Sequence, residues 1–393
     1  MAEPVGARRR PRILLVDDQR DVARTLSKLL STLNAEFRFA DDGETGLERL
    51  RTEFFDLALI DLSMPPDGSG GLWLLRQLAE YGIGTPTVIL SGQEGQDETI
   101  EAQRIGARDY VVKHKAAGEL LDIVTEVLTE ATEAHWQIAT TRLPAPVAIP
   151  LIQSRLQTDD VHRLRDSIHC VESIFRFTAL AAAATCRDLL TDHFKRPPAM
   201  GTWRSLCRAL QARIVAPALH DWLGTVADRS ADDLVAVRND VAHGGVPTAS
   251  WAKERQRDVD DWLALFVTIA ATHPAPRVVV AGKLEHTGDG FVVDVADLAG
   301  SATAVRWEQL HVADPLRRGR AHLVVDDEPP IDLWPLILSD PTDRPGQWNV
   351  SVLDSVTSKG RLRYLDLARG ERVDSQTTVA ALNRPEFGGD PIS

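Results

Sequence analysis

Short apolar runs alternate with helical apolar repeats along residues 11–130. The runs predict five strands: Ile13–Val16, Glu36–Ala40, Leu57–Ile60, Thr87–Leu90 and Tyr110–Val112. Apolar residues at helical spacing predict the helices between and after them: Asp21–Leu33, Glu44–Glu53, Leu72–Tyr81, Asp97–Ile105 and Glu119–Leu128. This strand–helix alternation predicts a doubly wound α/β domain of the flavodoxin-like type, with five parallel strands.

The pattern changes twice after this domain. Residues 131–157 begin as a helical tail and then carry Pro144, Pro146 and Pro150, which predicts a linker whose prolines break regular structure. Residues 158–273 show long helical periods and predict an all-α bundle. Residues 277–385 show short β-type runs separated by Gly and Asp turns, and predict a small β-rich domain.

Five helices are expected in the bundle: Val161–Arg187, Gly201–Arg213, Leu219–Ala227, Ala231–Ala242 and Ser250–Thr272. The expected C-terminal strands are Arg277–Ala281, Gly290–Val295, His322–Val325, Val350–Leu353 and Arg361–Leu365. The segment Leu333–Leu338 is also strand-like, and its Pro335 suits an edge strand because proline cannot donate to a ladder.

Composition narrows the function classes. Among 393 residues, 44 Lys and Arg against 57 Asp and Glu give a formal net charge of −13, which argues against a protein that coats nucleic acid. Three cysteines exclude a disulfide scaffold. No signal peptide and no apolar membrane-spanning run is present, so we expect a cytoplasmic protein without membrane attachment.

Acidic residues stand at the carboxyl ends of the predicted strands, where open α/β sheets bind ligands. Asp17 and Asp18 end the first strand and Asp61 ends the third, while Ser91 and Lys113 end the fourth and fifth. Converging carboxylates need a cation, and an all-oxygen site suits Mg²⁺. The set predicts phosphoryl-transfer chemistry, in which an aspartate can act as nucleophile.

These residues resemble the response-regulator receiver domain over about Pro11 to Leu128. The matching segments are Val16-Asp17-Asp18, Leu59-Ile60-Asp61-Leu62-Ser63-Met64-Pro65, Val88-Ile89-Leu90-Ser91-Gly92 and Gly106-Ala107-Arg108-Asp109-Tyr110-Val111-Val112-Lys113. The resemblance implies that Asp61 is the phosphoacceptor and that a Mg²⁺ ion is held by Asp17, Asp18, Asp61 and the Ser63 backbone carbonyl. It further implies that Ser91 and Tyr110 are switch residues and that Lys113 contacts the phosphoryl group.

Two features depart from the family pattern. His114 follows Lys113 where the family usually has proline, and the loop after Met64-Pro65 is long and rich in glycine. Neither departure removes a charged participant, so we expect the domain to accept phosphate. The resemblance also implies a bacterial two-component system, with a sensor histidine kinase or phosphotransfer protein, or a small phosphodonor, as the phosphoryl source.

A second motif lies in the expected bundle, at Val237-Arg238-Asn239-Asp240-Val241-Ala242-His243-Gly244-Gly245. Arg238 and His243 are five residues apart, about 140° around a helix, so they need not point the same way but could meet across a two-fold axis. A histidine at a helix C-terminus can also be a simple cap.

This motif resembles the HEPN family of all-α domains, whose signature is Arg, four to six residues and then His. The resemblance implies a homodimer with a metal-independent RNase site, in which His243 transfers protons, Arg238 binds the scissile phosphate and Asn239 supports them. RNA is then a possible target, and no DNA-binding motif is recognised. The alternatives are a phosphorylation-gated interaction or dimerisation module without catalysis, and a receiver that only drains phosphate.

Overall fold

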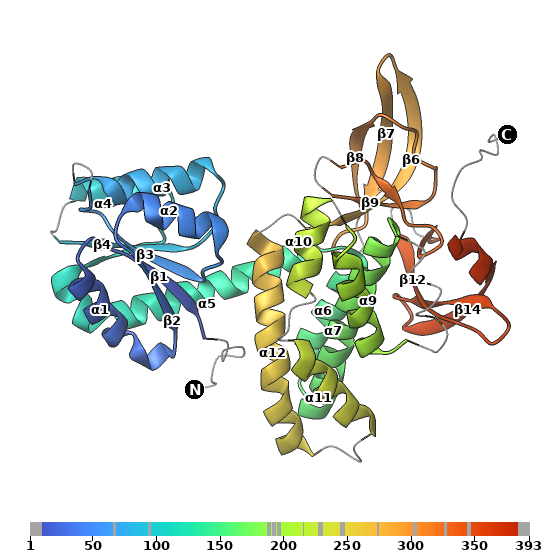
Figure 1. Cartoon of the computed structure of the whole chain (residues 1–393), viewed down its shortest axis with the longest axis horizontal. Coiled ribbons are helices and arrows are strands. Elements are labelled where there is room, and N and C mark those ends of the chain that lie inside the picture. The colour runs from blue at the N-terminus through green and yellow to red at the C-terminus, as the bar shows by residue number, and fades with distance from the viewer. Residues whose placement is uncertain are drawn as a thin grey trace. The chain divides into compact units, whose positions relative to one another are not determined.

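The computed structural model divides the chain into two compact units (Figure 1). It describes residues 10–65, 68–92, 96–186, 190, 194, 198–214, 216–226, 231–243, 248–272, 275–301, 305–325, 328–343 and 347–383. The first unit contains residues 1–137 together with 267–272, and the second contains 138–266 and 273–393. Within the described parts of the chain, no helix combines the length and hydropathy needed to cross a bilayer.

The first unit is built on a parallel sheet in the order β2-β1-β3-β4-β5. Its strands are β1 (Arg12–Val16), β2 (Glu36–Ala40), β3 (Leu57–Asp61), β4 (Thr87–Ser91) and β5 (Asp109–Val112). Its helices are α1 (Arg20–Leu29), η1 (Ser31–Leu33), α2 (Gly43–Thr52), α3 (Gly70–Glu80), α4 (Gln96–Ile105), η2 (Lys113–Lys115) and α5 (Ala116–Arg142). The predicted five-stranded parallel α/β fold is confirmed.

Alternate residues of the central strands supply two cores, as expected for a sheet covered on both faces. Ile13 and Leu15 of β1 pack in the cluster that contains residues of α1 and α5. Leu14 and Val16 of the same strand pack in the cluster that contains residues of α2, α3 and α4. Both faces of β1 are therefore covered, which explains its unbroken apolar run, and polar residues gather at the carboxyl ends of the strands.

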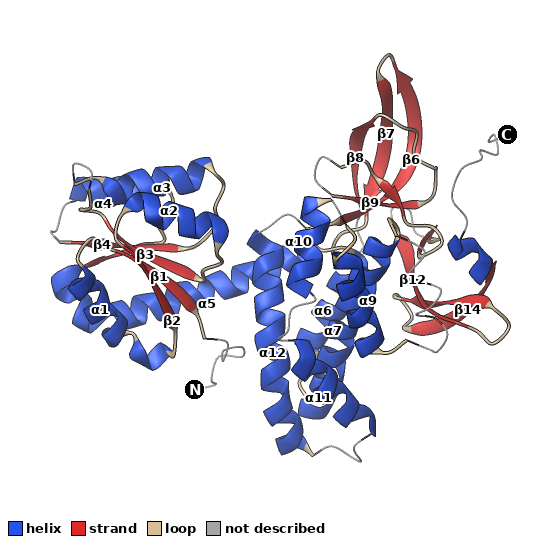
Figure 2. Ribbon diagram, viewed as in Figure 1, coloured by secondary structure: helices blue, strands red, loops and turns tan. Residues whose placement is uncertain are grey.

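The second unit combines a helical region with two antiparallel sheets (Figure 2). Its helices are α6 (Ala145–Leu156), α7 (Asp160–Ala183), α9 (Met200–Gln211), α10 (Pro217–Val226), α11 (Ala231–His243) and α12 (Ala249–Thr272), whose last residues belong to the first unit. Helix α7 is buried along most of its length, and it contacts α6, α9, α10, α11 and β12. It is the central helix of this unit.

The sheets have the orders β10-β9-β6-β7-β8 and β11-β12-β13-β14. Their strands are β6 (Arg277–Thr287), β7 (Gly290–Asp297), β8 (Arg306–Val312), β9 (Ala321–Val324), β10 (Ile331–Asp332), β11 (Ile337–Pro341), β12 (Trp348–Val356), β13 (Arg361–Asp366) and β14 (Glu371–Thr378). A 3-10 helix, η4 (Val379–Asn383), follows. The expected β-rich C-terminal region is present, and it shares one compact unit with the helices.

In residues 131–157 the expected helical tail is present, but the segment after it, expected to be irregular, is a second helix. Helix α5 continues to Arg142, and α6 occupies Ala145–Leu156 with Pro146 in its first turn and Pro150 inside it. Proline is tolerated at a helix start because its missing N–H has no partner there. Pro150 is accommodated in a buried helix whose other side chains, such as Val147 and Leu151, pack in the core. The burial of these side chains therefore stabilises a helix in spite of its two prolines.

The strands of the C-terminal region differ from the prediction in two ways. Residues Leu333–Leu336 form a turn, and β11 begins only at Ile337, so Pro335 precedes the edge strand rather than lying in it. Strands β8 and β14 were not expected, because their polar residues hide the alternation that marks a strand. Both are edge strands, and all of their residues are exposed or half-buried.

Candidate functional site: an acidic cluster at the strand ends

Three carboxylates converge at the carboxyl edge of the parallel sheet. Asp17 and Asp18 follow β1, and Asp61 ends β3, which pairs with β1 in register from Ile13–Leu57 to Val16–Ile60. One oxygen from each of the three carboxylates lies within 4.8 Å of the others. Asp17 and Asp61 are each only 1 % exposed, whereas Asp18 is exposed to solvent. The sheet order therefore brings together the acids that the sequence placed at separate strand ends.

Lys113 supplies the balancing cation inside this cluster. Its Nζ lies 2.8 Å from Asp17 Oδ2 and 2.8 Å from Asp61 Oδ2. The residue is the first of η2, directly after β5, rather than the last of the strand as expected. Burial lowers the pKa of the ammonium, but hydrogen bonds to Asp17 and Asp61 outweigh it, so the pKa of Lys113 is raised. Lys113 is therefore charged across the physiological range.

Each of the two buried aspartates is held by Lys113 and by one backbone N–H group. Burial raises the pKa of Asp61 above its ordinary value, even though the hydrogen bond from Lys113 opposes that shift. The backbone N–H of Ser63 donates to Asp61 Oδ1 at 3.3 Å, and that of Gln19 donates to Asp17 Oδ1 at 2.8 Å. These backbone bonds fix the direction of each carboxylate, while its second oxygen faces Lys113.

Two glycines allow the start of α3 to pack against the backbone that carries Asp61. A Cβ on Gly71 would lie 2.2 Å from the Asp61 carbonyl oxygen, and one on Gly70 would lie 2.4 Å from the Pro65 carbonyl oxygen. The Gly70 N–H donates to the Met64 carbonyl at 3.0 Å. Sequence reasoning noted a glycine-rich loop but missed this close approach. The dipeptide Gly70-Gly71 at a helix start was the available signal.

The two expected switch residues lie on neighbouring strands. Ser91 is buried at the end of β4, opposite Val112 of β5 in the ladder. Tyr110 on β5 is half-buried and packs against the cluster formed with α2, α3 and α4. Thus Ser91 stands at the same sheet edge as the acids, and Tyr110 sits on the strand next to it.

The donor set fits Mg²⁺. Carboxylate oxygens are the ligands this ion prefers, and a hydrated ion needs only one or two protein carboxylates directly. The convergence of Asp17, Asp18 and Asp61 offers that set, and the solvent exposure of Asp18 leaves room for water. Lys113 alone carries one positive charge against three carboxylates, so the cluster retains negative charge that a divalent cation would offset.

The residues of the second motif lie on α11, in the second unit. Arg238 is half-buried, and its Nη1 donates to Oδ1 of the exposed Asn239 at 3.3 Å. His243 ends the helix, but its side chain lies outside the described part of the structure, as do Gly244 and Gly245. Whether Arg238 and His243 meet, within one chain or across a dimer, stays a prediction.

Comparison with known proteins identifies the N-terminal part. The family model of the response regulator receiver domain matches residues 13–125. The transcriptional regulatory protein DltR of Streptococcus agalactiae is 33 % identical over 110 residues, 28 % of this chain and 48 % of its own. The response regulator protein FleR of Pseudomonas aeruginosa is 34 % identical over 139 residues, 35 % of this chain and 28 % of its own.

The match therefore spans about half the length of DltR and less of FleR. Among solved structures, the receiver domain of the Francisella response regulator 1452 is 28 % identical, covers 30 % of this chain and 98 % of its own, and has a TM-score of 0.29. The family match, the parallel sheet and the acidic cluster agree on one assignment. The N-terminal part of this chain is a response regulator receiver domain.

Proposed function

We propose that the chain is a two-component response regulator that is phosphorylated on Asp61. The observation that carries this proposal is the cluster in which Lys113 bridges Asp17 and Asp61 at 2.8 Å, with the Asp18 carboxylate beside them. A histidine kinase, a phosphotransfer protein or a small phosphodonor would supply the phosphoryl group. DltR is named as a transcriptional regulatory protein and FleR as a response regulator, which is consistent with a regulatory role.

The chemistry follows from the residues that face one another. A carboxylate oxygen of Asp61 attacks the phosphorus atom, the bond from phosphorus to the donor's nitrogen or oxygen breaks, and an acyl phosphate forms. Lys113 offsets the negative charge on the phosphoryl oxygens, and Asp17, Asp18, Asp61 and the Ser63 carbonyl would hold Mg²⁺. When bound, that ion supplies further positive charge at the phosphoryl oxygens. Ser91 would then donate a hydrogen bond to the phosphoryl group, and Tyr110 would turn inward.

The test is phosphorylation of the full chain by a small acyl phosphate in the presence of Mg²⁺. Intact-mass analysis should show the addition of one phosphoryl group, sensitive to hydroxylamine as an acyl phosphate is. Asp61→Asn should abolish it, whereas Asp41→Asn should keep it, because Asp41 is a surface carboxylate that pairs with Arg20 and is not one of the three clustered acids. Phosphorylation that survives in Asp61→Asn would place the acceptor elsewhere.

The output is proposed to be the second unit. Helix α5 starts in the receiver and runs without interruption to Arg142, and the division between the units falls within it, after Gln137. A change on the α4–β5–α5 side of the receiver is therefore covalently continuous with the second unit through a helix, which is stiffer than a flexible linker. This continuity favours a second unit that the receiver regulates over a receiver that acts only as a phosphate sink.

The RNase hypothesis for that output rests on Arg238, Asn239 and His243 of α11. It predicts RNA cleavage by the full chain, assayed with and without Mg²⁺ and a beryllofluoride phosphoryl mimic. His243→Ala should abolish cleavage, and His162→Ala should not, since His162 is an exposed partner of Asp159 on α7. Absence of cleavage in both states would favour the alternative, a phosphorylation-gated interaction or dimerisation module.

A further inference from the structure

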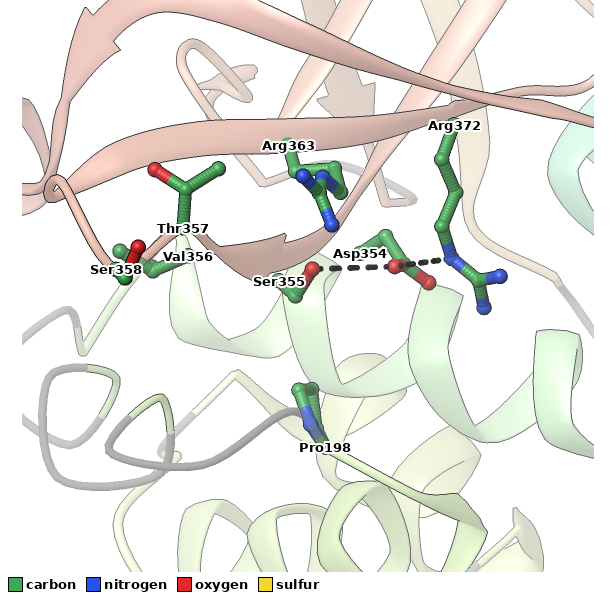
Figure 3. Close-up of a pocket in the computed structure, with 8 residues that line it drawn as sticks. All are labelled: Pro198, Asp354, Ser355, Val356, Thr357, Ser358, Arg363 and Arg372. Atoms are coloured by element: carbon green, nitrogen blue, oxygen red, sulfur yellow. Dashed lines mark hydrogen bonds and ion pairs between the residues drawn. The ribbon is translucent and has the colours of Figure 1, made fainter.

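A pocket of about 460 Å³ lies in the second unit, between the strands β12–β14 and the segment that precedes α9 (Figure 3). Its walls carry two arginines, Arg363 on β13 and Arg372 on β14, the carboxylate of Asp354, and three hydroxyl groups, those of Ser355, Thr357 and Ser358. Pro198 closes the opposite side. Both arginines project from the sheet toward Asp354 and Ser355. The volume is in the range of small-molecule sites in proteins.

The two arginines are held by pairs that an anion can displace. Arg372 Nε donates to Asp354 Oδ2 at 2.8 Å, and Arg363 Nε donates to Asp374 Oδ1 at 2.6 Å. The Arg372 side chain is 62 % exposed and that of Arg363 is 39 % exposed. The Arg363–Asp374 pair is open to water on both sides, so solvent screens it and it adds little stability. Arg372 is also open to water, although its partner Asp354 is only 9 % exposed. A ligand with more negative charge can therefore compete for both guanidinium groups.

Asp354 would keep a counter-ion if Arg372 turned to a ligand. Its second oxygen, Oδ1, lies 3.3 Å from Nη2 of Arg176, a buried residue of α7. Arg176 is only 3 % exposed, and within the described residues its Nε and Nη1 have no hydrogen-bond partner. A buried carboxylate left without a cation would be costly. Here the buried Arg176, whose Nη2 also donates to Glu172 Oε1 at 3.3 Å, remains in place, and Ser355 Oγ still donates to Asp354 Oδ2 at 3.2 Å. Arg372 can therefore exchange partners without leaving Asp354 unpartnered.

We infer that this pocket binds a small organic phosphate. Two guanidinium groups can each give two parallel hydrogen bonds to phosphate oxygens, and the hydroxyls of Thr357 and Ser358 can donate more, whereas Ser355 Oγ already donates to Asp354 Oδ2 at 3.2 Å. A phosphate has three oxygens to accept these bonds, whereas a carboxylate has two. The pocket is several times larger than a phosphate group alone, so the remaining space takes the organic part, against the ring of Pro198.

Isothermal titration of the full chain with adenosine 5′-monophosphate, inorganic phosphate and adenosine tests the inference. EDTA in the buffer keeps the receiver's acidic cluster from contributing. The monophosphate should bind, inorganic phosphate should bind more weakly and compete with it, and adenosine should not bind. Tighter binding of adenosine than of both phosphates would overturn the inference, as would no binding of either phosphate at millimolar concentration.

Substitutions locate the site. Arg372→Gln and Arg363→Gln should each weaken binding by about tenfold or more, the loss expected for one charge-assisted pair. Arg369→Gln is the matched control, because Arg369 is an exposed arginine in the β13–β14 turn and does not line the pocket. The affinity of the Arg369→Gln variant for adenosine 5′-monophosphate should equal that of the wild type. Equal loss in all three variants, with circular dichroism showing each of them folded, would mean general attraction to the surface and no site.

Discussion

At the scale of single residues, the charge of Lys113 allows two buried aspartates to lie next to each other. Asp17 and Asp61 are almost fully buried, and each has an oxygen 2.8 Å from the same ammonium nitrogen. Two carboxylates whose oxygens lie within 4.8 Å of each other repel one another unless a cation lies between them. Lys113 therefore stabilises the receiver as well as serving phosphoryl transfer.

Replacing Lys113 with methionine should lower the free energy of unfolding of the receiver by roughly 3 kcal/mol, because breaking a buried pair leaves an uncompensated charge. Urea unfolding in the absence of Mg²⁺ measures this change in the free energy of unfolding. Lys28→Met, at an exposed position on α1, should change the unfolding free energy little. An unchanged midpoint for Lys113→Met would show that the two acids need no cation.

His322 on β9 predicts a dependence of stability on pH in the second unit. It is 2 % exposed, its Nδ1 lies 3.0 Å from the Arg320 carbonyl, and burial lowers its pKa below the ordinary value of about 6.5. The folded state thus binds fewer protons than the unfolded state. Its contribution to stability is complete above about pH 6.5 and is lost as the pH falls below that value.

Thermal unfolding at pH 7.5 and pH 5.5 checks this dependence. The loss of stability on acidification should be smaller in His322→Gln than in the wild type. His311→Gln on β8, at an exposed position, should keep the wild-type loss. Identical losses in all three proteins would assign the acid sensitivity to other groups.

At the scale of elements, the first turn of α3 positions the phosphoacceptor strand. The Gly71 N–H donates to the Leu62 carbonyl at 3.3 Å, and the helix start lies against the Asp61 backbone with no room for a side chain. The long glycine-rich loop, which departs from the usual family pattern, thus ends in a tight contact beside the acidic cluster.

Gly71→Ala should destabilise the receiver by about 1–3 kcal/mol, the usual cost of overpacking. It should also slow phosphorylation of Asp61, since relief of the clash moves the backbone that bears this residue. Gly84→Ala is the control because a Cβ there meets nothing within 4 Å. Urea unfolding and the rate of acyl-phosphate formation are the readouts. Equal values for both variants would mean that the α3 contact does not position Asp61.

At the scale of the whole molecule, the chain has two compact units, and only the first holds the acidic cluster. A ligand that binds one folded unit raises the stability of that unit by mass action. In differential scanning calorimetry, 10 mM Mg²⁺ should therefore raise the midpoint of one unfolding transition and leave a second one in place. Asp17→Asn should remove the shift. A single transition that moves as a whole would show that the units unfold together.

Local pattern was sufficient to predict much of this protein. The strand and helix order of the receiver, and the residues Asp17, Asp18, Asp61 and Lys113, could be placed from the sequence because buried parallel strands are short apolar runs. Their carboxyl ends share one edge. The helices α7, α9, α10, α11 and α12 were likewise anticipated from their periodicity, within a few residues at each end.

Only the tertiary structure decided features that depend on distant partners. The prolines of α6 suggested a break, yet packing against α7 holds a helix there. The polar edge strands β8 and β14 exist because neighbouring strands pair with them, an interaction that leaves no local trace. Arg176 of α7 and Arg372 of β14 both pair with Asp354 of β12, and Arg363 of β13 lines the same pocket as Asp354. Sequence patterns record which residues are apolar and at what period, whereas contacts between remote segments arise only when the chain has folded.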